Sequence, residues 1–471
     1  MASAEWETRM KGVQKGILAF LILVSVLHLG YSVARYNPIT HPEVSGDFRV
    51  TFDGASDWRR TGSYDATGLT SGGVYYPPLY YTFLLPFTHF ELKRVAYFFY
   101  FTQFILFYFA IVFLVKAASN RRRPALPEYL IATILTLNFQ PFLETLASHK
   151  VEGIELFLIC LAIGFYRDKK DLFCGALIGL ATHLKYLPGI LIGYFLLKRE
   201  SKVLLGIGCA GVLLLVFLFA VLGFQTGWAY TIQHPFHLLF GGTPATHLFD
   251  AAMERQTLGS TLYRWFAVPV PPATFQHNLR IGSIGRVANP RLAFAVITFL
   301  KVLLVGLYLY FIGIKRGSLS QRKSRWTFYL LEIALTLLMI FVVAQGVRPQ
   351  YGILVLPSFV IVALLLYHRW DLFGLREKAL FSVAYSLSGM IIPGGVLNQL
   401  PPHPLWGREH ATMYQYLSLP FYGYLTLGLC ILLCYDRLLK WEGVGFPQND
   451  LAKPSQKSLG LWRNNQPLPK V

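Results

Sequence analysis

The sequence predicts an all-α polytopic membrane protein with about twelve transmembrane helices. Three observations lead to this fold class: 54% of the 471 residues are hydrophobic, only 14% are charged, and the apolar residues form long uninterrupted runs, as at 95–115 and 203–224. Runs of about 20 apolar residues span the hydrocarbon core of a bilayer, whereas soluble domains carry about 25% charged residues. A soluble enzyme is therefore excluded.

Twelve apolar segments follow one another along the chain. In order, they are 16–34, 95–115, 129–147, 153–166, 172–184, 186–197, 203–224, 292–314, 326–344, 351–367, 379–397 and 413–435. The first is preceded by Arg9, Lys11 and Lys15 and has no small-residue cleavage site, so we expect it to remain as a signal anchor. The N-terminus is then cytoplasmic.

Basic residues mark alternate loops, as at 116–123, 167–170, 198–202 and 315–325. With twelve crossings, 27 of the 43 Lys and Arg residues fall on the cytoplasmic side, as the positive-inside rule requires. The net charge of +19 therefore indicates membrane orientation. Without an RNA- or DNA-binding motif, it does not indicate a nucleic-acid partner.

Two segments decide the number of crossings. We predict two short helices in 172–197, because a single helix there would move the following basic loop outside. The stretch 76–90 is also apolar, but it is shorter than the roughly 20 residues of a straight span and contains Pro77, Pro78 and Pro86. We expect it to lie as a helix at the outer interface.

The outer face then carries most of the non-membrane chain: 35–94, a short loop near His149, and 225–291. These stretches hold aromatic and basic residues but no GxGxxG and no P-loop, so nucleotide binding has no support. All five cysteines lie in apolar segments. They predict neither disulfides nor a metal site.

Three motifs resemble one known family. The first runs from Gly46-Asp47 through Gly62-Ser63-Tyr64 to Tyr76-Pro77-Pro78-Leu79. The second is Lys185-Tyr186-Leu187-Pro188, and the third is Gln256-Thr257-Leu258 with Arg264. Together they resemble glycosyltransferase family 87 (DUF2029), mannosyltransferase-like members of the GT-C superfamily that use polyprenyl-phosphate sugars.

The resemblance implies a GT-C-type fold with interfacial helices in the first outer loop. Its divisions would be a cytoplasmic N-terminus 1–15, a GT-C-like membrane module 16–224 containing a catalytic first outer loop 35–94, a large outer loop 225–291, C-terminal membrane helices 292–435 and a cytoplasmic tail 436–471. The implied reaction moves a sugar, with mannose expected, from a polyprenyl-phosphate donor to a hydroxyl of a lipid or glycan acceptor. The expected location is the outer face of a bacterial plasma membrane, in contact with membrane lipids.

Such a reaction needs a carboxylate near the acceptor hydroxyl and cations near the departing phosphate. Asp47 follows the first span by about 13 residues and is the candidate general base; a solvated or helix-capping Asp is the alternative. Asp53, six residues on, does not share a helical face with Asp47. A secondary role in acceptor binding or capping is expected for it.

Three outward cations are candidate ligands of the donor phosphate: Lys185, Arg264 and Arg348. An Arg fork matches phosphate oxygens in bidentate fashion. The alternatives are a snorkelling Lys185 whose ammonium reaches lipid headgroups, and arginines that meet headgroups directly.

A second polar group lies at a membrane boundary and comprises His149, Lys150, Glu152 and Glu155. We expect His149, Glu152 and Gln256 to take secondary roles near the acceptor. Glu155 lies inside an apolar run, where a carboxylate costs so much free energy that it is a functional candidate on this ground alone. A structural ion pair with Lys150 is the alternative. No cofactor is expected, and a divalent metal has no support in the sequence.

A transporter or lipid-linked-sugar flippase is the alternative function, because intramembrane Glu155, Lys301 and Glu332 are natural in such proteins. We expect Lys301 and Glu332 to pair between helices instead. Inverted repeats are not visible, and a transporter does not need a long outer loop that opens with an Asp motif. Another GT-C family, such as a lipid A- or protein-modifying enzyme, is the nearest competitor within the transferases.

Overall fold

Every regular element of the described chain is helical. The computed structural model describes residues 46–64, 76–119, 123–149, 151–233, 257–266, 290–314, 326–344, 349–389 and 418–443, with short pieces at 22–23, 25–27 and 30. Within these ranges there is no strand, so the predicted all-α class is confirmed.

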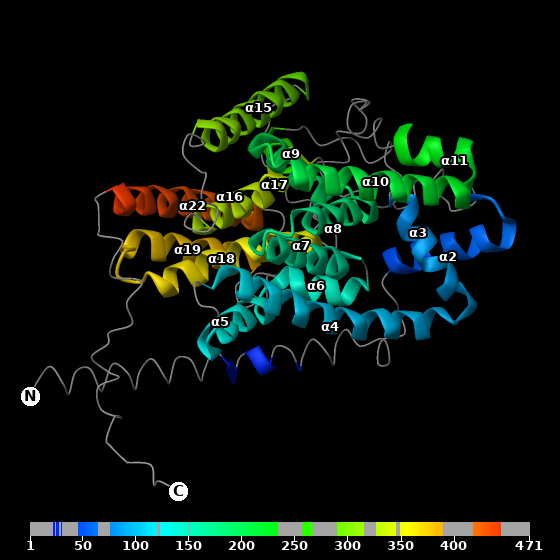
Figure 1. Cartoon of the computed structure of the whole chain (residues 1–471), viewed down its shortest axis with the longest axis horizontal. Helices are drawn as coiled ribbons and strands as arrows, with labels where there is room; N and C mark the ends of the chain where they lie inside the picture. Colours follow the sequence, from blue (N-terminus) through cyan, green and yellow to red (C-terminus); the bar gives the residue numbers. More distant parts are fainter. Residues whose placement is uncertain are drawn as a thin grey trace, which may run out of the picture.

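The helices follow one another as an antiparallel bundle, with short helices at its ends (Figure 1). They are α2 (Gly46–Thr61), α3 (Pro78–Leu84), η3 (Leu85–His89), α4 (Leu92–Ala118), α5 (Leu126–Leu137), α6 (Gln140–Ser148), α7 (Glu152–Arg167), α8 (Asp171–Leu184), η4 (Leu187–Gly189), α9 (Ile190–Lys198), α10 (Ser201–Leu222), α11 (Phe224–Trp228), η5 (Ala229–Gln233), α14 (Leu258–Phe266), α15 (Pro290–Ile314), α16 (Trp326–Leu338), α17 (Ile340–Val343), η7 (Pro349–Val355), α18 (Leu356–His368), α19 (Leu375–Gly389) and α22 (Leu419–Gly443).

Fewer helices reach full membrane length than the twelve predicted segments. Among the described residues, six are long and apolar enough to cross a bilayer: Leu92–Ala118, Ser201–Leu222, Ala295–Gly313, Trp326–Val343, Tyr351–His368 and Leu419–Trp441. Shorter apolar helices occupy Leu126–Leu137, Asp171–Leu184 and Leu187–Lys198. The predicted first span, 16–34, and the end of 379–397 lie largely outside the described residues.

The segment 129–147, predicted as one span, is two helices. α5 ends at Leu137, and α6 restarts at Gln140 with Pro141 in its first turn. A proline is tolerated in a first turn but not in the middle of a helix, because it lacks an N–H and its ring meets the preceding turn. The polar residues Asn138 and Gln140 before the proline are the signal for this break.

The predicted break inside 172–197 is confirmed. α8 ends at Leu184, and Lys185 adopts an extended conformation (φ −160°, ψ 141°) before η4 and α9. The motif Lys185-Tyr186-Leu187-Pro188 therefore forms a connection between two short helices.

The helix ends that carry the basic loops meet at one end of the bundle. The Arg167 guanidinium donates to the Ser119 carbonyl at 3.1 Å, so the ends of α7 and α4 are neighbours. At the same end, Tyr166 donates to Glu200 at 2.8 Å and the Trp326 indole donates to the Ala117 carbonyl. Figure 1 shows α5, α19 and α22 reaching this end, on the left, and α2, α3 and α11 gathered at the opposite end. This grouping agrees with the alternation predicted from charge.

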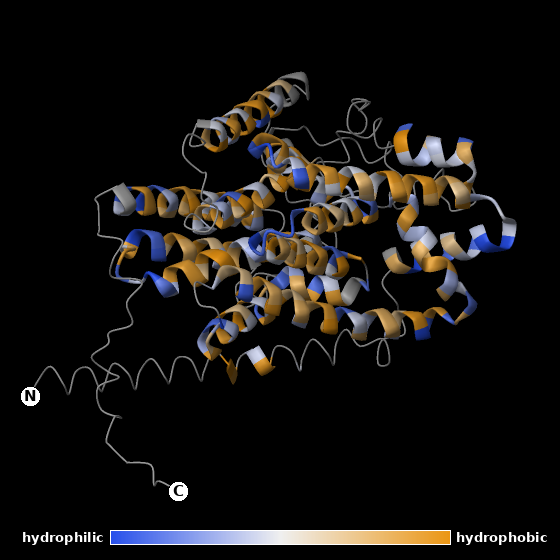
Figure 2. Ribbon diagram, in the orientation of Figure 1, coloured by the Kyte–Doolittle hydropathy of each residue, from blue (hydrophilic) through white to orange (hydrophobic). Residues whose placement is uncertain are grey.

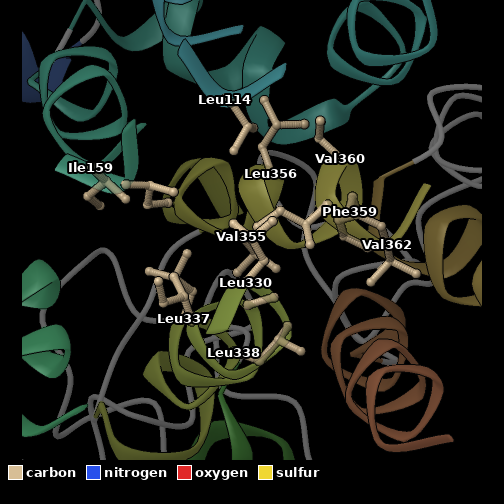
Figure 3. Close-up of a cluster of buried hydrophobic side chains, with 14 of the residues drawn as sticks. Leu114, Ile159, Leu330, Leu337, Leu338, Val355, Leu356, Phe359, Val360 and Val362 are labelled. Carbon is tan, nitrogen blue, oxygen red and sulfur yellow. The ribbon is translucent and has the colours of Figure 1, made fainter. Parts of the chain in front are cut away.

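The interior is apolar and centred on α16 and α18, whose side chains are almost all buried. Leu330, Leu337, Val355 and Phe359 pack together there with side chains from α4 and α7 (Figure 3). Large apolar side chains on α4, α10 and α15 instead face outward, among them Phe101, Tyr108, Leu213, Val216, Phe299 and Val302. These helices are mostly orange in Figure 2, and an outward apolar surface of this extent is typical of contact with lipid.

Glu332 binds a different cation from the one expected. Its carboxylate lies 2.8 Å from Nζ of Lys198 and accepts hydrogen bonds from Tyr194 at 3.0 Å and Tyr435 at 3.3 Å. The Lys301 ammonium instead lies 3.5 Å from the Val343 carbonyl. The expected Lys301–Glu332 pair is wrong, because the short α9 ends beside α16 and brings Lys198 to the carboxylate.

Glycines allow α8 and α10 to pack with their backbones in contact. A Cβ at Gly206 would collide with the Leu172 carbonyl of α8, and one at Gly175 would collide with the Val203 carbonyl of α10. Gly208, two residues along α10, has nothing within 4 Å of its Cβ position.

We predict that Gly206→Val destabilises the protein by about 1–3 kcal/mol through overpacking. Gly208→Val on the same helix is the matched control, because it makes the same change of residue type in open space. Unfolding of each purified variant in detergent measures the difference. Equal stability of the two variants would contradict the close packing of α8 on α10.

Candidate functional site

α2 is an amphipathic helix that begins with the first motif. Its buried side chains recur at helical spacing and are Phe48, Thr51, Phe52, Ala55 and Trp58, while Arg49, Arg59 and Arg60 are exposed. Asp47 stands in the first helical turn, one residue before the fully buried Phe48. The position of the Asp47 side chain lies outside what the structure describes.

Asp53 lies on the outward face of α2. Its side chain is exposed, and partial burial, with a smaller contribution from Asp57, raises the pKa of Asp53 above its usual range against the opposing effect of Arg49. Because the Asp47 side chain is not described, the expectation that Asp53 and Asp47 lie on different faces of the helix stays a prediction.

His149 lies beside the start of α2. It ends α6 in a left-handed conformation (φ 54°) and is buried, and its ring centroid lies 6.3 Å from that of Phe48 and 5.8 Å from that of Tyr100. The turn at His149 leads directly into α7. It therefore joins the Asp47 region to the carboxylates at the start of that helix.

The segment 76–90 does not cross the membrane, as predicted, but it is less superficial than an interfacial helix. α3 and η3 have seven and five residues, and Pro78, Leu79, Tyr80, Tyr81 and Leu84 are buried. α3 packs against α2, α8 and α10. Its tyrosines form a cluster with Tyr64, whose ring centroid lies 5.8 Å from that of Tyr81.

Lys185 is buried and paired, so it does not snorkel. Its Nζ lies 2.7 Å from Oε1 of Glu152, and the two side chains are 9% and 0% exposed. Two aromatic rings flank the same ammonium, with their centroids 3.6 Å away for Tyr351 and 4.8 Å away for Tyr76. Four segments distant in sequence therefore meet at Lys185.

Glu155 lies one turn along α7 from Glu152 and is fully buried. It interacts electrostatically with Lys185 and with Glu152, but neither of its oxygens has a hydrogen-bond partner among the described residues. Oε2 of Glu152 is in the same situation. Lys150, the alternative partner, lies outside the described residues.

We call Glu152, Glu155, Lys185, Tyr76 and Tyr351 the Lys185 cluster. Tyr80 of α3 borders it and interacts with Glu152, Glu155 and Thr51, which connects the cluster to α2. Sequence reasoning missed Tyr80, Tyr76 and Tyr351 as site residues. The signal that could have indicated them was the presence of tyrosines in and beside the first motif, and again shortly after Arg348.

The remaining predicted residues are placed only by their backbone or not at all. Arg264 belongs to α14, which packs against α15 and α17, but its side chain is not described. Gln256 and Arg348 lie outside the described residues. Arg348 immediately precedes η7, which carries Tyr351 to Lys185, and follows α17 by five residues. The Arg264 helix therefore packs next to the helix that leads to Arg348.

Among the residues described, no group of three or more His, Cys, Asp or Glu side chains could hold a metal ion. Chemically, the site offers carboxylates, one paired ammonium and several phenol rings. These groups suit the binding and proton chemistry of polar, hydroxyl-bearing molecules.

A comparison with protein families gives one result. The family model described as Glycosyltransferase family 87 matches residues 75–340, which is more than half of the chain. The matched region includes α3, α7, α8 and α14. No curated protein matches the chain.

We predict that breaking the Lys185–Glu152 pair on one side strongly destabilises the protein. Glu152→Gln should destabilise the protein by about 3–5 kcal/mol, because it leaves a buried ammonium without its carboxylate. The double variant Glu152→Leu/Lys185→Met should be markedly more stable than either single loss of charge. Unfolding in detergent tests this, and a double variant as unstable as the sum of the single variants would exclude the pairing.

Proposed function

The chain belongs to glycosyltransferase family 87, and on that premise we propose that it transfers a sugar, with mannose expected, from a polyprenyl-phosphate donor to a hydroxyl of a lipid or glycan acceptor. It is a multi-pass membrane glycosyltransferase. We propose the outer face of a bacterial plasma membrane as the site of transfer. The observation that most supports this proposal is the junction of α2, the His149 turn and the Lys185 cluster at one end of the bundle.

In the proposed reaction, the acceptor hydroxyl oxygen attacks the anomeric carbon of the sugar. The bond from that carbon to the phosphate oxygen breaks, and the polyprenyl phosphate leaves with the electron pair. The acceptor proton passes to a carboxylate. Since the phosphate is already a good leaving group, positioning, one base and nearby cations are what the protein has to supply.

We assign the base to Asp47. It begins the motif that resembles the family, and it lies in the first turn of an amphipathic helix at the end of the bundle opposite the basic loops. The helix N-terminus favours an ionised carboxylate, which is the form that accepts a proton. Asp53, on the exposed face of the same helix, together with His149, Glu152 and Gln256, is proposed to act near the acceptor.

Arg264 and Arg348 are our principal candidates for the donor phosphate. α14, which carries Arg264, packs against α17, and Arg348 follows α17 by five residues in the sequence. Lys185 remains a candidate, but its ammonium is already neutralised by Glu152 at 2.7 Å. A phosphate that replaced Glu152 would leave that carboxylate buried without a cation, at a high cost in free energy.

Membership in a glycosyltransferase family argues against the transporter or flippase alternative. Two of the three charges that favoured transport also have local partners, since Glu332 pairs with Lys198 and the Lys301 ammonium lies 3.5 Å from the Val343 carbonyl.

We predict that Asp47→Asn lowers the rate of transfer by about 10²- to 10⁴-fold, the usual effect of losing a general base. Protein yield and donor binding should stay near wild type, because the amide keeps the shape of the carboxylate. Asp53→Asn on the same helix is the matched control and should be milder. Transfer assays with a polyprenyl-phosphate sugar measure both; full activity in Asp47→Asn would remove the assignment, and lost donor binding would indicate a structural role.

We also predict that α2 faces the outside of the membrane. In a Cys209→Ser background, which removes the exposed native cysteine, a membrane-impermeant thiol reagent should label Thr61→Cys in intact cells. It should not label Lys202→Cys, at the start of α10 in a basic loop, until the cells are broken. Labelling of Lys202→Cys in intact cells would invert the topology.

A further inference from the structure

The Lys185 cluster holds more acceptors than its own donors can satisfy. The single ammonium of Lys185 lies near two carboxyl groups, those of Glu152 and Glu155. It pairs with Oε1 of Glu152. Oε2 of Glu152 and both oxygens of Glu155 have no hydrogen-bond partner among the described residues, although both side chains are fully buried. Burying such groups without donors is costly. Buried ionisable side chains of this kind in membrane proteins most often belong to a functional site, where a ligand can satisfy them.

The charge of the cluster selects the kind of ligand. Glu152 already neutralises the Lys185 ammonium, so the cluster has no free positive charge to offer a phosphate, and its unpartnered carboxyl oxygens attract hydrogen-bond donors. Neutral hydroxyl groups satisfy carboxylate oxygens without adding charge. The chemistry therefore favours a polyhydroxylated group over the anionic part of a lipid-linked donor.

The rings of the cluster point to the same class of ligand. Tyr351 and Tyr76 flank the ammonium with centroids at 3.6 and 4.8 Å, and Glu152 contacts the same ammonium at 2.7 Å, so aromatic rings lie close to a carboxylate. A hexose presents hydroxyl donors around its edge and C–H groups on its faces. Carboxylates beside aromatic rings match both features.

The cluster is also close to the proposed base. Tyr80 interacts with Glu152, Glu155 and Thr51, and Thr51 lies four residues after Asp47 on α2. Four residues of an α-helix span about 6 Å. A sugar bound at the cluster would therefore lie within reach of the start of α2.

We propose that Glu155 and Oε2 of Glu152 form a hexose subsite, in which the two carboxyl groups accept hydrogen bonds from sugar hydroxyls. Tyr351 and Tyr76 pack beside the ring. The inference rests on the proposed function, because it identifies the part of the substrate that this end of the bundle binds. The hexose belongs either to the lipid-linked donor or to the acceptor, and both present the same chemistry.

The test compares three probes on the full-length protein in detergent: a short-chain polyprenyl-phosphate mannose, the same polyprenyl phosphate without sugar, and methyl α-mannoside. Wild-type protein should bind the mannosyl lipid more tightly than the bare lipid. Glu155→Gln should reduce that preference about tenfold, as expected for a lost charged hydrogen bond, and should leave affinity for the bare lipid unchanged. Because Glu155 has no hydrogen-bond partner among the residues that the structure describes, this variant should fold with wild-type stability or better.

Three further variants sharpen the test. Tyr351→Leu should lower the same preference through lost ring contact. Glu332→Gln changes a buried carboxylate at the opposite end of the bundle, so it should cost stability and keep the preference. Arg264→Ala, at the proposed phosphate ligand, should weaken both lipids equally.

The outcomes separate the two proposals. Loss of preference for the mannosyl lipid in Glu155→Gln supports a donor hexose, and weakened methyl α-mannoside binding with an intact lipid preference supports an acceptor hexose. An equal effect of Glu155→Gln on both lipids, or unchanged binding of all three probes, overturns the subsite. If wild-type protein binds neither lipid, the proposed donor is wrong, and the methyl α-mannoside measurement alone decides whether a hexose binds.

Discussion

The contact between Lys185 and Glu152 is the interaction on which this end of the molecule depends. The extended backbone at Lys185 separates α8 from α9, and the ion pair attaches that break to the first residue of α7. Tyr351 of η7 and Tyr76, just before α3, close around the same ammonium. One buried charge thereby fixes the relative positions of four segments that the sequence separates by up to 275 residues.

The bundle keeps its buried charge near its two ends and its middle apolar. At the basic end, Glu332 meets Lys198; at the other end, Glu152 meets Lys185. Lys185 lies between the short helices α8 and α9, and Lys198 is the last residue of α9. α8 itself packs tightly on α10 through Gly175 and Gly206. The break between the two short helices and the close glycine contact together place one lysine near each end of the bundle. Lys185 and Lys198 therefore reach their carboxylates without crossing the apolar middle.

The sequence alone predicted the features that local chemistry controls. Apolar runs and basic loops predicted the helical membrane class, and the charges after residue 197 correctly predicted two helices around Lys185. It could not predict partners brought together by packing: Lys198, not Lys301, binds Glu332, and the tyrosines around Lys185 come from distant motifs. The division of 129–147 into two helices was missed because hydropathy is high on both sides of Asn138. Pro141 was the residue that indicated a new helix start. For the site, Lys185 and Glu152 were selected separately, but nothing in their spacing showed that they touch.

The shortness of α8 has a consequence for how substrates arrive. α8 starts at the basic end, at Asp171, and has 14 residues, so it rises only about 21 Å, less than the ~30 Å thickness of a bilayer hydrocarbon core. With the start of α8 placed at one membrane surface, Lys185 would lie below the far surface. A head group tethered to a long lipid tail can reach that depth by lateral diffusion within the leaflet, whereas a water-soluble sugar nucleotide would have to leave its hydration shell. If the proposed function holds, the length of this one helix would favour membrane-borne over dissolved substrates.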